Sequence, residues 1–127
     1  MDLELSKLKI TERQLDNVMV LALSGEILLD DGDLEFRKKV HELVERGVVR
    51  IVVDLGGVTH IDSAGVGMLV AKQKTVHEHG GDIKLVHVTT RSQRLLAIMR
   101  LATVFEIFDD EEAAAKSFSW SESDKKR

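Results

Sequence analysis

A carboxylate, a hydroxyl and two glycines stand close together at the start of a predicted helix, in the segment 60–67. Gly65 and Gly67 each cost up to ~1 kcal/mol relative to alanine inside a helix, so helix stability does not explain them. Small residues at a helix N-terminus let another molecule's backbone or a phosphate approach closely, and the helix dipole favours an anion there. Ser63 is expected to cap this helix through its hydroxyl. The alternative interpretation is that both glycines pack tightly against a sheet.

An enzyme would need a base for Ser63 to act as a nucleophile. The five histidines form no metal-ligand pattern, and Ile61 stands where a nucleophile elbow needs its first glycine. His79 lies 16 residues along the helix, or ~24 Å away. His60 is therefore the only nearby base, and we interpret it as a solvated loop histidine. We expect no catalytic activity.

Asp54, at the end of a predicted central strand, raises a second alternative, the two-component receiver. A receiver needs an acidic pair after its first strand, where this chain has only Gly25-Glu26. The predicted N-terminal hairpin is also wrong for that fold. We interpret Asp54 as a hydrogen-bonded strand terminus.

Composition excludes several other classes of function. The 127 residues include no Cys, which excludes disulfides, thiol catalysis and Cys-ligated metals. The net charge is −4, and only the end of the chain, Lys125 to Arg127, is basic, which argues against direct nucleic-acid binding. No apolar stretch approaches the ~20 residues that span a bilayer, and the acidic start Met1 to Glu4 is wrong for a signal peptide. We expect a soluble cytoplasmic chain, or a soluble module of a larger protein, with no cofactor and no bound metal.

Apolar periodicity predicts the elements that position these residues. Gly25 is expected to end the second strand, and Gly56-Gly57 the third, with 58–61 as a short connector. The expected strands are Lys9 to Gln14, Val18 to Leu23, Val48 to Leu55, Asp82 to His87 and Glu106 to Phe108. The nearly continuous β-branched run of the third strand is typical of a strand that helices cover on both faces.

Four helices follow from the spacing of apolar residues and from their end signals. The first begins at an acidic cluster, which we interpret as helix capping, and ends at Gly47; the second ends at Gly80-Gly81. The cluster is Asp30, Asp31 and Asp33. The expected helices cover 34–44, Ser63 to His79, a third helix that Thr90 or Ser92 caps and that runs through Met99, and Asp109 to Phe118.

The order ββαβαβαβα predicts an α/β fold with one mixed sheet, made of the N-terminal hairpin and parallel strands and packed with four helices. Residues 1–118 form the expected domain, and 119–127 a flexible tail. Trp120 either folds back as a lid or lies on the surface; the sequence does not decide between these positions.

The segment from Ile61 to Gly67 resembles the Asp-Ser-(Ser/Thr)-Gly-(Leu/Val)-Gly signature of STAS domains, and specifically of bacterial anti-sigma factor antagonists. Further fragments occur in the family's order and extend the resemblance over nearly the whole chain. They are Leu23-Ser24-Gly25-Glu26, Val52-Val53-Asp54-Leu55, Gly80-Gly81, Leu96 to Leu101, Val104 to Phe108 and Glu112-Ala113-Ala114.

The resemblance implies a binding protein that changes partners when Ser63 is phosphorylated. It implies that the unphosphorylated form binds an ATP-dependent serine kinase that is also an anti-sigma factor, and so frees the sigma factor. A PP2C-type phosphatase would restore binding. The implied partner-binding residues are Glu26, Asp62, Ser63, Ala64, Gly65 and Gly67.

Two positions differ from the family's pattern. Ala64 replaces a second hydroxyl, which leaves Ser63 as the only acceptor in the motif. Ile27-Leu28-Leu29 follows Glu26, where the family often has a Leu-Asp pair. The same resemblance leaves another function open, because STAS domains also serve as accessory or regulatory subunits of membrane transporters and as scaffolds in stress-signalling assemblies.

Overall fold

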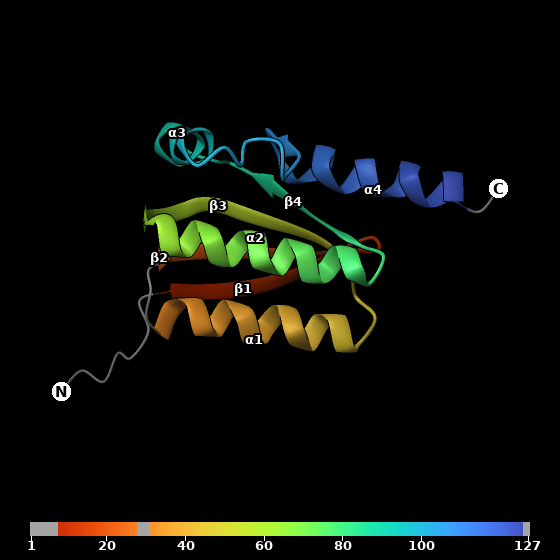
Figure 1. Ribbon diagram of the computed structural model, residues 1–127. Helices are drawn as coiled ribbons and strands as arrows, with labels where there is room; N and C mark the ends of the chain where they lie inside the picture. Colours follow the sequence, from red (N-terminus) through yellow and green to blue (C-terminus); the bar gives the residue numbers. More distant parts are fainter. Residues whose placement is uncertain (1–7, 28–30, 126–127) are drawn as a thin grey trace.

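Five strands form one mixed sheet in the order β1-β2-β3-β4-β5 in the computed structural model, which describes residues 8–27 and 31–125 (Figure 1). The antiparallel hairpin β1 (Leu8–Leu15) and β2 (Val18–Ile27) turns at Asp16, whose φ of 57° is left-handed. The next three strands are parallel to β2: β3 (Arg50–Ile61), β4 (Asp82–Val86) and β5 (Ile107–Phe108). The predicted order of elements and the mixed sheet are confirmed.

Four helices connect and cover the sheet. They are α1 (Asp31–Glu45), α2 (Ser63–Glu78), α3 (Thr90–Ile98) and α4 (Glu111–Lys125). α1 and α2 lie side by side on one face, and α4 covers part of the other (Figure 1). The backbone of α4 is helical to Lys125, beyond the point at which we placed the start of a tail. Among the described helices, none combines the length and apolarity needed to cross a membrane.

Alternating side chains of the central strands build two apolar layers. In β2, Met19, Leu21 and Leu23 pack toward α1 and α2, while Val18 and Val20 pack toward α4. β3 follows the same alternation, as predicted for a strand that is covered on both faces. Full burial of each such side chain contributes roughly 1.5–3 kcal/mol, so the two layers fix the register of the strands.

The prediction that Gly25 and Gly56-Gly57 end their strands is wrong. Both strands continue to the bounds given above, and the expected connector 58–61 pairs with the end of β2. The register shifts twice there, and a Cβ at Gly57 would lie 2.8 Å from the Cβ of Ser24. Glycine therefore lets the two strands approach closely through an irregular region instead of separating them. The longer β3 carries the chain directly to the first turn of α2.

The helix stops were predicted more accurately than the third helix start. Gly47 and Gly80 have left-handed φ values of 79° and 83° just after α1 and α2, which confirms them as stop residues. The N-cap of α3 is Thr89, whose Oγ1 accepts a hydrogen bond from the Ser92 amide at 3.1 Å. This cap lies one residue before the first predicted candidate.

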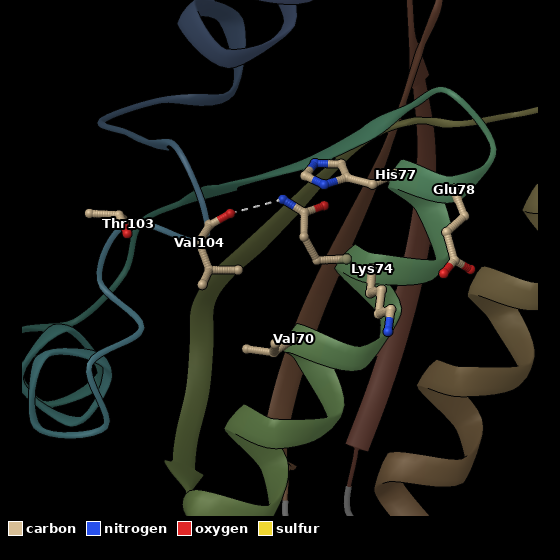
Figure 2. A pocket seen from close by; sticks show the side chains of 7 residues that line it. Val70, Lys74, His77, Glu78, Thr103 and Val104 are labelled. Atoms are coloured by element: carbon tan, nitrogen blue, oxygen red, sulfur yellow. Dashed lines mark hydrogen bonds between the residues drawn. The ribbon is translucent and has the colours of Figure 1, made fainter.

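Gln73, buried in α2, ties this helix to β4. Its Oε1 accepts from the Ile83 amide at 2.8 Å, and its Nε2 donates to the Ile83 carbonyl at 3.1 Å. The same Nε2 also donates to Asp82 Oδ1 at 2.8 Å and to the Val104 carbonyl at 3.2 Å (Figure 2). One side chain thus satisfies backbone groups on β4 and on the segment before β5.

Replacing Gln73 by methionine keeps the volume of the side chain but removes these hydrogen bonds. We expect Gln73→Met to lower the free energy of unfolding by about 2–3 kcal/mol, because buried backbone groups lose their partners. Urea denaturation followed by circular dichroism measures this change. The matched control Gln93→Met, at an exposed position, should change stability by less than about 0.5 kcal/mol. Equal effects of the two variants would contradict this role of Gln73.

Candidate functional site

The end of β3 and the start of α2 are joined by a carboxylate cap. Asp62 has extended backbone angles, and its Oδ1 accepts a hydrogen bond from the Gly65 amide at 2.8 Å. Asp62 is therefore the N-cap, and the prediction that Ser63 caps the helix is wrong. The carboxylate is favoured at this position because it satisfies the third amide of the helix and also complements the helix dipole.

Ser63, as the first residue of the helix, is exposed. Its hydroxyl makes no hydrogen bond with any part of the chain that the structure describes. The early amides of α2 form a partly positive helix end around it, which suits an anion. The site therefore presents a free hydroxyl at a position that tolerates added negative charge. Ala64 beside it is half-buried.

The two glycines of the motif have different environments. Gly65 is buried, and a Cβ there would lie 2.3 Å from the Ile27 carbonyl oxygen at the end of β2. Gly67 is exposed, and a Cβ there would meet nothing within 4 Å. Close packing against the sheet therefore explains Gly65. Intramolecular packing does not explain Gly67, whose side chain is missing from the open face of α2.

Glu26 lies at the same edge of the sheet as the serine motif. It pairs in register with His60, and Glu26 Oε2 lies 3.4 Å from His60 Nδ1. His60 is exposed, as expected, but it belongs to β3 and not to a loop. Thr59 further fastens the two strands because its Oγ1 donates to the Gly25 carbonyl at 3.1 Å. The structure thus brings Glu26 near the motif through strand pairing that the sequence pattern did not reveal.

A second group of polar residues lies on the face of the sheet that carries α4. Asp54 Oδ1 accepts from the Gly56 amide at 2.8 Å and lies 3.0 Å from His87 Nδ1. Asp54, Gly56 and His87 line a pocket of about 340 Å³ together with Ser24. Asp54 is hydrogen-bonded, as expected, but it lies within β3 and not at its end. Sequence reasoning missed His87, and the only signal for it is its position directly after the strand that pairs with β3.

Another pocket, of about 480 Å³, lies farther along α2 than the serine motif. Val70 and Val104 contribute aliphatic walls, and the lining also includes His77 (Figure 2). The Nε2 of His77 lies 2.9 Å from Asp82 Oδ1. Within the described residues, no three His, Cys, Asp or Glu side chains converge on a possible metal position.

Of the partner-facing residues implied by the sequence, Glu26, Asp62, Ser63, Ala64 and Gly67 gather around the first turn of α2, with Gly65 buried beneath them. Helix capping by the acidic cluster at the start of α1 stays a prediction, because Asp30 and the side chains of Asp31 and Asp33 lie outside the described residues. The same holds for Leu28, Leu29 and the side chain of Trp120.

Comparison with known proteins identifies similar chains. The family model described as "Mlab, STAS domain" matches residues 10–107. The anti-sigma-B factor antagonist of Bacillus subtilis is 29% identical over 100 residues, which cover 79% of this chain and 90% of that protein. The crystal structure of TM1081 from Thermotoga maritima has a TM-score of 0.78 at 26% identity and covers 85% of this chain and 92% of that one. The phosphorylated form of the Bacillus protein SpoIIAA shows the shared fold at 17% identity, with a TM-score of 0.67 and coverage of 86% and 99%.

The different environments of the two glycines predict opposite effects of the same substitution. Gly65→Ala should lower the free energy of unfolding by about 1–3 kcal/mol, because the new methyl group would overlap the Ile27 carbonyl. Gly67→Ala should raise it by about 0.5–1 kcal/mol, because alanine favours the helix and meets no neighbour. Urea denaturation of both variants measures these changes. Changes of the same sign in the free energy of unfolding would contradict the difference in packing between the two positions.

Proposed function

The chain belongs to the STAS domain family, among the anti-sigma factor antagonists, and we propose that phosphorylation of Ser63 controls which partner it binds. In the proposed cycle, the unphosphorylated chain binds a cytoplasmic serine kinase that is also an anti-sigma factor, and the sigma factor is released. Phosphorylation by that kinase dissociates the complex, and a PP2C-type phosphatase reverses the modification. The chain itself acts as a binding protein and not as a catalyst.

The observation that carries this proposal is the free hydroxyl of Ser63 in the first turn of α2. A kinase needs an accessible hydroxyl, and Ser63 is exposed with no hydrogen bond to a described residue. Phosphorylation adds a charge of about −1.5 to −2. Because the helix dipole favours an anion at this position, the domain accommodates the phosphate without repacking.

The same charge would weaken the binding of a partner that covers this turn. Asp62 and Glu26 already place two carboxylates at this edge of the sheet, so a phosphate adds to a negative region. Its volume and charge would both oppose a surface fitted closely to the unmodified turn. The open space at Gly67, one turn along, supports a close approach of the partner to the helix. The relative SpoIIAA has been solved in a phosphorylated form, which supports phosphorylation as the modification.

Incubation with the purified cognate kinase and ATP should add one phosphate to the chain. Mass spectrometry of the peptides should locate it on Ser63, and Ser63→Ala should take up none. A phosphate on another residue, or none with a kinase of demonstrated activity, would contradict the proposed switch.

The same site predicts the order of affinities for the kinase. Ser63→Ala should bind like the unmodified chain, whereas Ser63→Asp should bind at least about tenfold more weakly, a difference of about 1.4 kcal/mol. Isothermal titration calorimetry with the purified kinase measures both. Ala113→Asp adds the same charge to the first turn of α4 and is the matched control, with unchanged affinity expected. If Ser63→Asp bound the kinase as tightly as Ser63→Ala and the control Ala113→Asp, negative charge at Ser63 would not be the switch.

A further inference from the structure

α3 and the turn after it form a second basic region, which the expectation of basic residues only at Lys125 to Arg127 did not include. The segment 88–105 contains three arginines and no Asp or Glu, whereas the whole chain has 22 acidic residues and 18 basic ones. We call the exposed side chains of Arg91, Arg94, Ile98 and Arg100 the α3 surface. Such a local excess of positive charge suits a negatively charged partner surface.

The helix presents this surface outward because of its spacing. Ser92 and Leu96 are buried and anchor α3 to the domain. Arg91, Arg94 and Ile98 follow one another at intervals of three and four residues, so they share the opposite face. Ile98 is 73% exposed, the highest value among the exposed large hydrophobic residues that the structure describes. An apolar side chain between arginines is the composition of a protein-binding surface, where the apolar group is buried by the partner.

The side chains of the three arginines form no polar contact with the described part of the chain. None of their guanidinium groups makes a hydrogen bond or an ion pair with a described residue. Elsewhere, Arg13 contacts Glu111, and Arg46 lies 3.7 Å from Glu42. The guanidinium groups of the α3 surface therefore remain available to carboxylates of another molecule.

Arg100 also occupies a backbone position that favours glycine. Its φ is 63°, and it closes α3 with hydrogen bonds from its own amide to the Ala97 carbonyl at 3.0 Å and from the Leu101 amide to the Leu96 carbonyl at 2.7 Å. A helix normally places glycine here, because a side chain is strained at positive φ. The fold gives no reason for an arginine at this strained position, which supports a role for its side chain outside the domain.

The α3 surface lies at the same end of the molecule as Ser63. β3 and β4 are parallel neighbours, and each leads into the helix that follows it, so α2 and α3 both begin at this end of the sheet (Figure 1). A protein that covers the first turn of α2 can therefore extend onto α3.

We propose that the α3 surface is a second contact region for the kinase that engages Ser63, and that it binds an acidic surface of that kinase with an apolar recess for Ile98. This proposal rests on the proposed function. The α3 surface sets the affinity through charges that phosphorylation does not change, while Ser63 supplies the switch.

Titration of the purified cognate kinase with the full chain tests this assignment. Arg91→Glu/Arg94→Glu should weaken binding at least tenfold and reduce its dependence on salt concentration, and Ile98→Ser should weaken it about tenfold. The control Lys74→Glu/Lys116→Glu makes the same change in charge at two exposed lysines of α2 and α4 and should leave the affinity unchanged. Arg100→Gly should raise the midpoint of thermal unfolding, because glycine relieves the strain, and should still weaken binding to the kinase. Weaker binding by a more stable variant would show that the loss comes from the missing contact and not from unfolding.

The outcomes distinguish this proposal from the one on which it rests. If the wild-type chain does not bind the kinase, the proposed function fails and this inference fails with it. If the wild type binds and the α3 variants bind equally well, only the α3 contact is wrong. Sedimentation with phosphatidylglycerol vesicles provides a further comparison. Binding of the wild type to these vesicles that is lost in Arg91→Glu/Arg94→Glu, with kinase affinity unchanged, would assign the surface to a membrane and overturn the proposal.

Discussion

The close contact between the first turn of α2 and the end of β2 is the constraint on which the site depends. The backbone of Gly65 lies against the Ile27 carbonyl, where any side chain would overlap it. This contact sets the distance of the helix from the sheet, and the Asp62 carboxylate then fixes the helix start from the other side. Ser63, between the two, is the first residue of the helix and is exposed. A residue without a side chain thus helps to hold the helix that presents this hydroxyl.

This arrangement separates the stability of the domain from its proposed regulation. The two apolar layers and the Gln73 hydrogen bonds lie away from the first turn of α2. A phosphate on Ser63 would break no hydrogen bond of the described chain, so its effect would fall on whatever protein covers the turn. The opposite arrangement, a buried serine, would link each phosphorylation to partial unfolding and to a large energetic cost.

Local periodicity was sufficient to predict the order of elements, because strand alternation and helical spacing are properties of neighbouring residues. It failed where contacts between distant residues decide the structure. The local sequence around Gly57 predicts the end of a strand. In the structure, Gly57 pairs closely with Ser24, and the strand continues through it. The Glu26–His60 and Asp54–His87 pairs depend on strand register in the same way. Asp62 and Ser63 are both good capping residues, and only the hydrogen bond to Gly65 distinguishes them.

We propose that phosphorylation of Ser63 changes the surface of a domain whose internal structure stays the same. Two-dimensional amide NMR of the unmodified chain and of the chain phosphorylated only on Ser63 tests it directly. We expect chemical shifts to change mainly in the first turn of α2 and in the adjoining ends of β2 and β3. The amides of β4, α4 and the apolar layers should keep their positions. Changes in amide chemical shift across the whole sheet would contradict this proposal, since they would show that phosphorylation repacks the domain.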